Sequence, residues 1–521
     1  MAPLHRHSVC CIAAFALLIS CQPPPPQPQT LRVSVLSQPP TLNPLYLSGR
    51  WLETIRVLAF SSLLATDPRG RLIPDAAERV PSMKNGLISR DGLTIRYRLR
   101  KGIMWQDGAP LTARDVVFTF RAIRNSHNSV PSRMGVNHIA WLRSSGRRDV
   151  VLRLNRPYAP ILSTFFGPDG YPILPWHLLH SFPSLDRARF GSKPIGSGPY
   201  RIVDWIHGQR IDLTANVRYF GAKPSVQKIR IEDYPSIETA QLALQTHQID
   251  ADFNIDSANI SSGNLGSFRV KREPSGSIVM LAMNASDPAL RSPLIRQALM
   301  EGIDRSALIR IFRIDGIEPD AQELLPESAF YDRRIAPQPY DPVRAARMIR
   351  SVTQGRRLRL RLAYSDLVPD ADRIAVVLSD QLGRIGIRLR LRRYQPELFF
   401  GAAPQGVVFG GHYQLALVPL IPAFDPDNSE IFGCSKIAPL GFNFSRICDP
   451  QLDGLMYEAA RTYDTYRRAA LYAAVARRLN ADVPGIFLWE PSSVVAYQNN
   501  LSGVEPSAFS SIFWNANTWK L

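Results

Sequence analysis

The chain has 521 residues, of which 45% are hydrophobic and 20% are charged, and its formal net charge is +18. This length exceeds what one hydrophobic core usually organises, so we expect two or three lobes. The hydrophobic content excludes a largely disordered chain, and the positive charge indicates an anionic partner or surface.

The first twenty residues have the pattern of an export signal. A short basic region with Arg6 precedes an apolar run from Val9 to Ile19, which is too short to span a bilayer and suits a signal peptide. Ser20 before Cys21 resembles a bacterial lipobox, which implies cleavage before Cys21 and lipidation of its thiol; an ordinary signal peptide cut nearby is the alternative. Residues 21–30 are rich in proline and predict a stiff tether between the lipid and the folded body.

The first half of the folded body is predicted to contain strands and one capped helix. Residues 93–99 and 150–154 alternate as strands do, and between them Thr112 and Asp115 form a capping-box pattern ahead of an apolar helical stripe. The segment PIGSGPYRIVDW, residues 194–205, has the glycines of a phosphate-binding loop. Two alternating runs at 200–206 and 210–215 predict a β-hairpin instead, so the helix N-terminus that such a loop needs is missing. We predict a structural joint there.

The second half is predicted to be α/β. Three helices are expected to begin at an N-cap residue followed by proline, at Ser292, Asp341 and Asp449. Residues 358–364, 370–385 and 387–394 have the patterns of a strand, a helix and a strand, which predicts a βαβ unit in a parallel or mixed sheet. A further helix is expected over residues 463–480.

The sequence lacks the motifs of common enzymes and metal sites. It contains no G-x-S-x-G or H-E-x-x-H motif, and His177 and His180 form at most a weak ligand pair. Residues 425–430 begin like a calcium loop, but Glu430 stands where the sharp turn needs glycine. We therefore predict no catalytic residue, no metal and no cofactor.

Export from the cytoplasm also determines the expected redox state of the cysteines and the expected partners of the positive charge. Only Cys434 and Cys448 remain in the exported body, where we expect a disulfide worth roughly 3 kcal/mol; two free thiols are the alternative.

Removing residues 1–20 takes away one arginine and no acidic residue, so the net charge falls to +17. We expect this basic surface to face anionic lipid headgroups or anionic solutes, not nucleic acid. The runs 356–364 and 388–394 alternate arginine with leucine, as half-buried strands with a solvated basic face do.

Seven stretches follow one another in a recognisable order: PPTLNPLYLSGRW (39–51), SSLLATDPRGRLIPDAAE (61–78), YRLRKGIMWQDGAPLTARDVVFTF (97–120), PIGSGPYRIVDW (194–205), RSPLIRQALMEGIDRSALI (291–309), YDPVRAARMI (340–349) and NFSRICDPQLDGLM (443–456). Together they resemble the family 5 extracellular solute-binding proteins, the peptide- and nickel-binding proteins that serve ABC importers. The resemblance covers nearly the whole mature chain.

The resemblance implies an α/β, two-lobe periplasmic-binding-protein (Venus-flytrap) fold with an extra subdomain inserted into lobe one. Lobe one would contain residues 31–60, the inserted subdomain at 61–190, residues 191–280 and a C-terminal return at 485–521; lobe two would contain residues 281–484. The joint at 194–205 would mark the re-entry into the sheet of lobe one. Cys434 and Cys448 flank a loop containing Asn443, as a disulfide pair does in dipeptide-binding relatives.

The implied function is the substrate-binding component of an ABC importer. Such a protein captures a peptide-like solute between its lobes and delivers it to an inner-membrane permease, here from the periplasmic face of the bacterial envelope as a lipid-anchored monomer. Nickel is disfavoured because the histidines are not grouped. Two alternatives stay open: a non-peptide anionic solute, and an envelope lipoprotein that uses the fold for docking or sensing.

The resemblance also carries over candidate ligand contacts: Tyr46, Ser48, Gly49 and Arg50 in lobe one, and Phe399, Phe424 and Asp425 in lobe two. Backbone and hydroxyl groups of the first set can pair with a peptide main chain, Arg50 can meet a carboxylate, and the two phenylalanines can form walls. Peptide-binding relatives hold the ligand's α-ammonium with an aspartate three residues before the position of Asp425, where this chain has Pro422. Asp425 or Asp427 can substitute for it, or Asp425 can merely cap the segment that follows.

Overall fold

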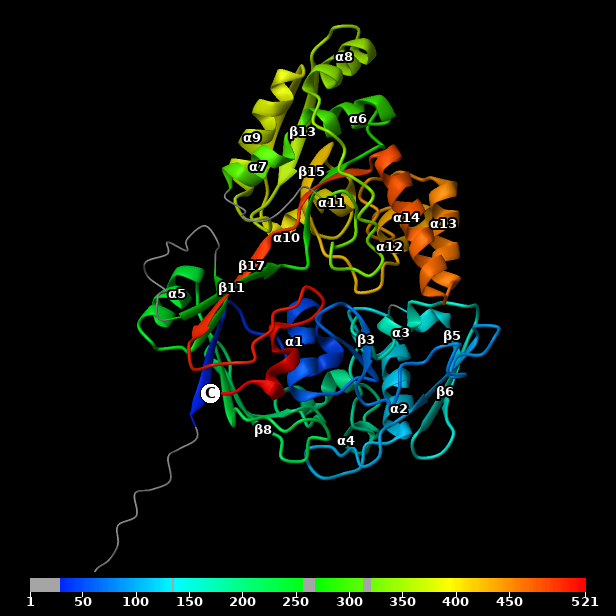
Figure 1. The fold of residues 1–521 in the computed structure, drawn as a ribbon, viewed down its shortest axis with the longest axis vertical. Helices are drawn as coiled ribbons and strands as arrows, with labels where there is room; N and C mark the ends of the chain where they lie inside the picture. Colours follow the sequence, from blue (N-terminus) through cyan, green and yellow to red (C-terminus); the bar gives the residue numbers. More distant parts are fainter. Residues whose placement is uncertain (1–28, 134, 256–267, 313–319) are drawn as a thin grey trace, which may run out of the picture.

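The computed structural model describes residues 29–133, 135–255, 268–312 and 320–521. The predicted signal peptide and the lipidation candidate Cys21 lie outside the described residues. Two large sheets, each covered by helices, form two lobes stacked along the longest axis of the molecule (Figure 1). The architecture is α/β, as predicted.

The lower lobe is built on a seven-stranded sheet. Its strand order is β11-β17-β10-β1-β9-β8-β7, with β1 parallel to both of its neighbours and β17 antiparallel to β10 and β11. The strands are β1 (Thr30–Val35), β7 (Tyr200–Ile206), β8 (Arg210–Ala215), β9 (Lys228–Asp233), β10 (Ala251–Ile255), β11 (Phe268–Pro274) and β17 (Ser492–Gln498). The predicted hairpin after residue 199 is confirmed as β7–β8.

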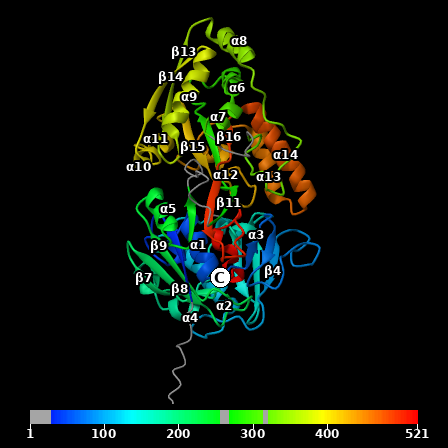
Figure 2. The ribbon, with the colours of Figure 1, turned by 60° about the vertical axis from the view of Figure 1, so that its left-hand side comes forward.

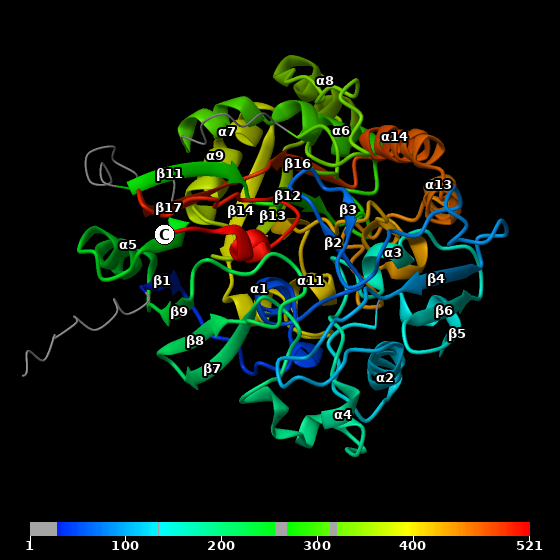
Figure 3. The ribbon, with the colours of Figure 1, turned by 60° about the horizontal axis from the view of Figure 1, so that its bottom comes forward.

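Residues between β1 and β7 extend this lobe to one side. They contain the hairpin β2 (Leu64–Thr66) and β3 (Leu72–Pro74), the three-stranded sheet of β4 (Thr94–Arg98), β6 (Asp149–Leu154) and β5 (Ile139–Ser144), and the helices α1 (Gly49–Ala59), α2 (Ala113–Arg124), α3 (Ile161–Thr164) and α4 (Trp176–Leu179). Figure 3 shows α2 and the three-stranded sheet on the side of the lobe opposite α5 (Ile237–Gln245) and β11. The predicted capping box of α2 is confirmed, because the Thr112 N–H donates to Asp115 Oδ2 at 2.7 Å.

The upper lobe is built on a five-stranded sheet of order β14-β13-β15-β12-β16. Its strands are β12 (Ile278–Met283), β13 (Leu358–Tyr364), β14 (Ile387–Arg393), β15 (Leu415–Leu420) and β16 (Gly485–Trp489). Helix α9 (Ala371–Arg384) connects the parallel strands β13 and β14, which confirms the predicted βαβ unit. The remaining helices are α6 (Pro293–Gly302), α7 (Arg305–Ile311), α8 (Pro342–Thr353), α10 (Pro396–Phe399), α11 (Val407–Gly410), α12 (Ser429–Phe432), α13 (Pro450–Arg461) and α14 (Thr465–Asp482).

Three predicted N-caps precede helices α6, α8 and α13. Asp341 accepts from the Arg344 N–H at 2.8 Å and Asp449 from the Gln451 N–H at 3.0 Å, whereas Ser292 makes no side-chain cap bond and relies on Pro293 at the first helical position.

The core of this lobe lies on both faces of its sheet: Leu362 packs on the α9 side, and its neighbour Ala363 packs on the side of α13 and α14. Among helices of the described ranges, none combines the length and apolar character that crossing a bilayer requires.

The chain passes between the lobes twice. Strands β11 and β12 are separated by residues 275–277, and β16 and β17 by residues 490–491, so both connections join one sheet to the other (Figure 2). The strand β16 therefore belongs to the upper sheet, although we expected lobe one from residue 485 onward. Its backbone pairs with β12 because the buried run Gly485–Trp489 completes the core of that lobe.

Candidate functional site where the lobes meet

The two lobes are joined directly at the segment after β15. Asp169, from the segment between α3 and α4, accepts the backbone N–H of Phe424 through Oδ1 at 2.9 Å and that of Asp425 through Oδ2 at 3.3 Å. Burial raises the pKa of Asp169, although the Phe424 N–H stabilises its charged form. One carboxylate of the lower lobe thus holds two donors of the upper lobe.

A second set of contacts lies beside it. The Ala159 N–H donates to the Ala460 carbonyl at 2.7 Å, and the Tyr463 hydroxyl donates to the carbonyls of Gly92 and Tyr158, each at 3.2 Å. The Tyr158 hydroxyl donates to Asp427 Oδ2 at 3.1 Å. The end of α13 and the connection to α14 therefore rest on the lateral part of the lower lobe, which fixes the approach of the two lobes at this side.

Asp425 is held inside the upper lobe by an arginine. Its two carboxylate oxygens accept from Nη1 and Nη2 of Arg468 at 2.8 and 2.6 Å, and its Oδ1 also accepts the Asp427 N–H at 3.0 Å. Burial opposes the charge of the Arg468 guanidinium, but the adjacent Asp425 carboxylate raises its pKa above the ordinary value. The pair is a buried, bidentate ion pair, so a ligand ammonium could reach Asp425 only by displacing Arg468.

Asp427 is also engaged. Besides accepting the Tyr158 hydroxyl, it accepts the Ser429 N–H through Oδ1 at 3.1 Å. Asp425 and Asp427 thus both have protein partners, and Pro422 offers no carboxylate. The role of Asp425 as a ligand contact stays a prediction, and its observed partners are those of a structural ion pair.

The four candidates in lobe one lie within five residues of one another, just before and at the start of α1. Tyr46 ends a short 3-10 helix and is half-buried beside Asp186; burial and then that carboxylate raise the pKa of its hydroxyl. Ser48, Gly49 and Arg50 are exposed, and Gly49 has a φ of +57°, in the left-handed region that favours glycine. In the described part of the chain, Arg50 forms no ion pair.

One carboxylate connects the start of α1 to the lobe contact. Glu53 lies one turn after Arg50. Burial is the main influence on the Glu53 carboxyl group and raises its pKa; the positive charges of Arg56 and Arg50 lower this pKa, and the negative charge of Asp169 raises it. The field of Asp169 therefore reaches the first turn of α1. Of the four candidates in lobe one, Arg50 is the one whose charge acts on Glu53 together with that of Asp169, the residue that holds the N–H groups of Phe424 and Asp425.

The two phenylalanine candidates lie in different surroundings. Phe424 is half-buried and packs edge-to-face on Phe509, from the segment after β17, with ring centroids 5.8 Å apart. Phe399 is 0% exposed and lies in the core with Tyr394 and Phe400. Phe399 therefore forms no wall in this structure, because the end of α10 turns its ring inward.

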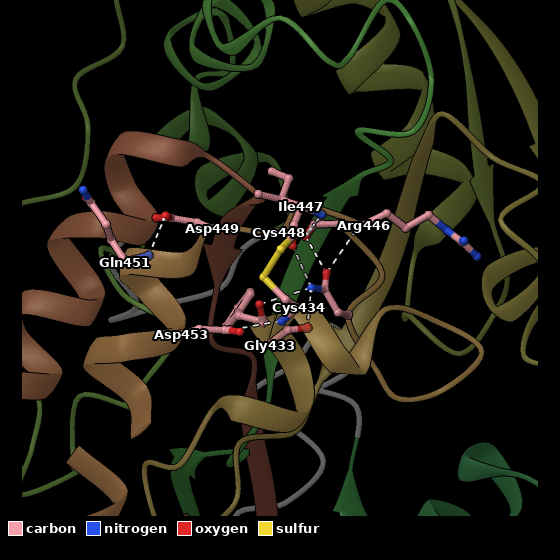
Figure 4. Close-up of a disulfide and its surroundings, with 11 residues drawn as sticks. Gly433, Cys434, Arg446, Ile447, Cys448, Asp449, Gln451 and Asp453 are labelled. Atoms are coloured by element: carbon pink, nitrogen blue, oxygen red, sulfur yellow. Dashed lines mark hydrogen bonds between the residues drawn. A yellow bond between two sulfur atoms is a disulfide. The ribbon is translucent and has the colours of Figure 1, made fainter. Parts of the chain in front are cut away.

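The predicted disulfide between Cys434 and Cys448 is present, with a Cα–Cα distance of 4.5 Å (Figure 4). It closes a loop around Asn443, whose buried side-chain amide donates to the carbonyls of Phe432, Gly433 and Ile447 at 3.1, 3.0 and 2.9 Å. The Cys434 N–H donates to Asp453 Oδ1 of α13 at 3.0 Å, which ties the loop to that helix. The disulfide thus supports the segment that follows the lobe contact.

One connection between the lobes carries a buried carboxyl group that the sequence analysis missed. Glu490, 4% exposed, lies between β16 and β17 and accepts through Oε1 from the N–H of Gly276 in the other connection, at 3.2 Å. Burial, together with nearby Glu327 and Asp320, raises the pKa of Glu490 to about 8, and burial raises that of Asp320 to about 7. The two connections are therefore linked by a carboxyl group that favours its protonated form.

Arg468 and Asp169 were also missed. An arginine in line with Tyr472, Val475 and Leu479 on α14 breaks an apolar stripe, which was the available signal for Arg468. Asp169 follows Pro168 in a loop, and no local pattern indicates its partners, because they lie more than 250 residues away.

A pocket of about 700 Å³ lies within the lower lobe and reaches Arg56, whose Nη1 donates to the carbonyl of Gly167, two residues before Asp169. It is enclosed by the end of α1, the β2–β3 hairpin and the C-terminal segment, including Arg56, Asp75, Tyr219 and Trp514. In the described ranges, no group of three or more His, Cys, Asp or Glu side chains is arranged to hold a metal ion.

Comparisons with known proteins give one family. Residues 71–432 match the family model of the bacterial extracellular solute-binding proteins, family 5 middle region. The chain is 24% identical over 510 residues to the oligopeptide-binding protein AppA of Bacillus subtilis, covering 92% of this chain and 89% of the relative. It is 24% identical to the di/tripeptide-binding protein 2 of Pseudomonas aeruginosa, covering 96% of each. The structure of the ABC transporter substrate-binding protein CtaP from Listeria monocytogenes superposes with a TM-score of 0.83 at 23% identity, over 95% of this chain and 99% of that one, which shows the same two-lobe fold.

Proposed function

Because the chain belongs to family 5 of the bacterial extracellular solute-binding proteins, we propose that it is the substrate-binding component of an ABC importer for a peptide or a related small solute. The observation that carries the proposal is the family match over residues 71–432 on a complete two-lobe fold. The oligopeptide- and di/tripeptide-binding relatives favour a peptide as the solute. They also favour import over an envelope protein that only docks or senses.

Capture would work by a shift between open and closed arrangements of the lobes. A solute that contacts both lobes adds its binding free energy to the closed form alone, and only this difference drives closure. The bonds from Asp169 to the N–H groups of Phe424 and Asp425 would form as the lobes close. The closed protein would then deliver the solute to an inner-membrane permease, and no covalent step, metal or cofactor is needed.

The lobe boundaries that we propose follow the strands. Lobe one, with its inserted subdomain, contains residues 31–60, 61–190, 191–274 and 492–521, and lobe two contains residues 278–489. The chain then crosses between the lobes at 275–277 and 490–491, where we had expected crossings near 280 and 485. We further propose a monomer at the periplasmic face of the envelope, anchored through Cys21 and the tether at 21–30. No nucleic acid partner is part of this function.

The proposed solute contacts are Tyr46, Ser48, Gly49 and Arg50 from lobe one and Phe424 from lobe two. Arg50, exposed and without an ion pair in the described residues, suits a solute carboxylate. We do not retain the buried Phe399, and we give Asp425 a positioning role because Arg468 occupies its carboxylate. An α-ammonium group would therefore not be the main anchor of the solute.

Calorimetric titration with matched peptides tests this proposal. We expect peptides with a free and with an acetylated N-terminus to bind within about tenfold of each other, and amidation of the C-terminus or an Arg50→Gln substitution to weaken binding more strongly, because a lost charged hydrogen bond costs about 1.5–3 kcal/mol. A loss of more than about a hundredfold on acetylation would contradict the assigned anchor. Binding of anionic non-peptide solutes alone would favour the alternative solute class, and no binding of any solute would overturn the transport function.

A further inference from the structure

Five arginines lie on one face of the two outer strands of the upper sheet. Strands β13 and β14 are parallel and in register, which places Arg359 beside Arg388, Arg361 beside Arg390, and Ala363 beside Arg392. Paired residues of neighbouring strands point to the same side of a sheet. We call this set the arginine face: Arg359, Arg361, Arg388, Arg390 and Arg392.

The alternation that produces the arginine face is fixed by the core. The residues between the arginines, among them Leu360, Leu362 and Leu389, are buried against α9, so the register cannot slip without exposing them. Arg359, Arg388, Arg390 and Arg392 are exposed and Arg361 is half-buried. The sequence pattern alone predicted half-buried strands with a basic face, and the pairing now joins the two runs into one array.

The arginine face lacks counter-charges. Within the described residues, no carboxylate lies within ion-pair distance of its five guanidinium groups, whereas some other exposed arginines of this lobe are paired: Arg334 with Asp332 at 2.8 Å, Arg384 with Asp380 at 2.6 Å and Arg467 with Glu458 at 2.6 Å. Arg393, at the end of β14, is also paired, with Asp366 and Asp372. Arg347, Arg350, Arg356 and Arg357 are also exposed and form no ion pair within the described residues, so the arginine face is distinguished by the register that places its charges side by side.

The array lies on the two outermost strands at one side of the sheet. Strand β14 is the edge of the sheet, and Figure 2 shows β13 and β14 along the margin of the lobe opposite α13 and α14. Neighbouring strands lie about 4.8 Å apart, and alternate residues of one strand about 6.7 Å apart, so five guanidinium groups occupy a small two-dimensional grid. Arginine binds phosphate oxygens bidentately, and a grid of this kind can contact several phosphate groups of one planar surface at once.

We infer that the arginine face docks onto the anionic phospholipid surface of a bilayer, a contact that goes beyond solute capture and does not depend on a lipid anchor. A planar headgroup layer presents phosphates in two dimensions, as the grid does. The groove of a nucleic acid duplex is narrower than a planar headgroup layer. Binding of single-stranded nucleic acid needs exposed aromatic rings between the basic groups. In the part of the chain that the structure describes, the aromatic ring that contacts this face is that of Tyr394, and the Arg392 guanidinium lies over it, 4.9 Å from the ring centroid.

The test is flotation of the purified protein with lipid vesicles, in a Cys21→Ser background so that no acyl chain mediates binding. One set of vesicles contains phosphatidylcholine alone, and the other contains phosphatidylcholine with phosphatidylglycerol. The variant Arg359→Gln/Arg388→Gln/Arg390→Gln removes three charges from the arginine face. The matched control, Arg334→Gln/Arg384→Gln/Arg467→Gln, removes three paired and exposed charges from the same lobe.

We expect binding to the anionic vesicles only, weakened on the order of 100-fold by the arginine-face variant and by less than about fivefold by the control. Raising the salt from 0.1 to 1 M shortens the screening length from about 10 to about 3 Å and should abolish the contact. Equal binding of both variants, or binding to phosphatidylcholine alone, would overturn the inference. Tighter binding to a DNA duplex or an anionic polysaccharide than to anionic vesicles, lost in the same variant, would assign the face to a soluble polyanion and overturn it as well. Unchanged solute titrations in the variant would show that the result is independent of the proposed transport function.

Discussion

At the scale of single residues, the segment 194–199 shows why a motif needs its tertiary context. Neither Gly196 nor Gly198 has a positive φ, so the conformation of the segment does not by itself require glycine at these two positions. Both glycines pass against the end of α1: the Gly198 N–H donates to the Ala59 carbonyl at 3.0 Å, and Gln106 bonds the backbone of Gly196. Glycine is needed at these positions because the backbone of this segment passes close to the backbone at the end of α1, which leaves no room for a Cβ.

A Gly196→Ala substitution should therefore be severe. Its new Cβ would lie 1.7 Å from the Ala59 carbonyl oxygen, which no rotamer change relieves, so we expect a loss of more than about 3 kcal/mol in the free energy of unfolding or a failure to fold. Gly383→Ala, in an open position within α9, is the control and should be neutral or stabilising by up to about 1 kcal/mol. Urea denaturation measures both, and similar values would contradict the assigned contact.

The pairing of Asp425 with Arg468 also makes a prediction at this scale. Asp425→Asn leaves a buried guanidinium without its charged partner, so we expect a loss of about 3–5 kcal/mol in the free energy of unfolding. Asp380→Asn, which breaks an exposed pair with Arg384, should cost less than about 1 kcal/mol. If Asp425 is instead a solute contact, the variant will keep its stability and lose solute affinity, as denaturation and titration on the same samples would reveal.

At the scale of elements, local patterns specified most of the structure. The alternation of β13 and β14, the helix between them and the caps of α2, α8 and α13 were all predictable, because each depends on residues within about one helical turn or one strand. Ser292 was predicted as a cap, yet its side chain makes no cap bond. The two shortest helices at the lobe contact, α3 and α12, have only four residues each and left no periodic signal.

The loop between Cys434 and Cys448 allows a test at the same scale. With a sequence separation of 14, the cross-link restricts the unfolded chain by about 3 kcal/mol, so the variant Cys434→Ser/Cys448→Ser should lose about that amount in thermal or urea unfolding. Reductant should shift the parent protein to the same midpoint and leave the double variant unchanged. A shift below about 1 kcal/mol would mean that Asn443 and Asp453 hold the loop without the cross-link.

At the scale of the whole molecule, the lobes communicate through few groups. Asp169→Ala leaves the N–H groups of Phe424 and Asp425 without their acceptor, so the closed arrangement should lose about 1–3 kcal/mol relative to the open one. We expect a larger radius of gyration by small-angle X-ray scattering and weaker solute binding by about tenfold or more. Asp149→Ala, which breaks only an exposed pair with Arg98, should change neither, and equal scattering curves for all three proteins would contradict the role of Asp169.

Glu490 makes the connections between the lobes sensitive to pH. Its pKa is raised from 4.5 to about 8, mainly by burial, so the folded chain binds this proton more tightly than the unfolded chain. The free energy of unfolding should therefore fall as the pH rises from about 4.5 to about 8, by at most about 1.4 kcal/mol per pH unit. Glu490→Gln keeps an acceptor for the Gly276 N–H and should flatten this slope in denaturation series between pH 5 and pH 8. Parallel slopes for the two proteins would show that Glu490 does not carry the effect.

The class of the fold, several of its strands and helices, the cysteine pair and the family were predictable without the structure, because each is recorded in short-range patterns or in motifs that keep their order along the chain. Which groups meet became visible only in the folded molecule. It paired Asp425 with Arg468, placed Asp169 against the segment after β15, buried Phe399, and joined two arginine runs into one face. The physical reason is that burial, charge pairing and pKa depend on neighbours supplied by distant segments, and no local periodicity records which segments those are.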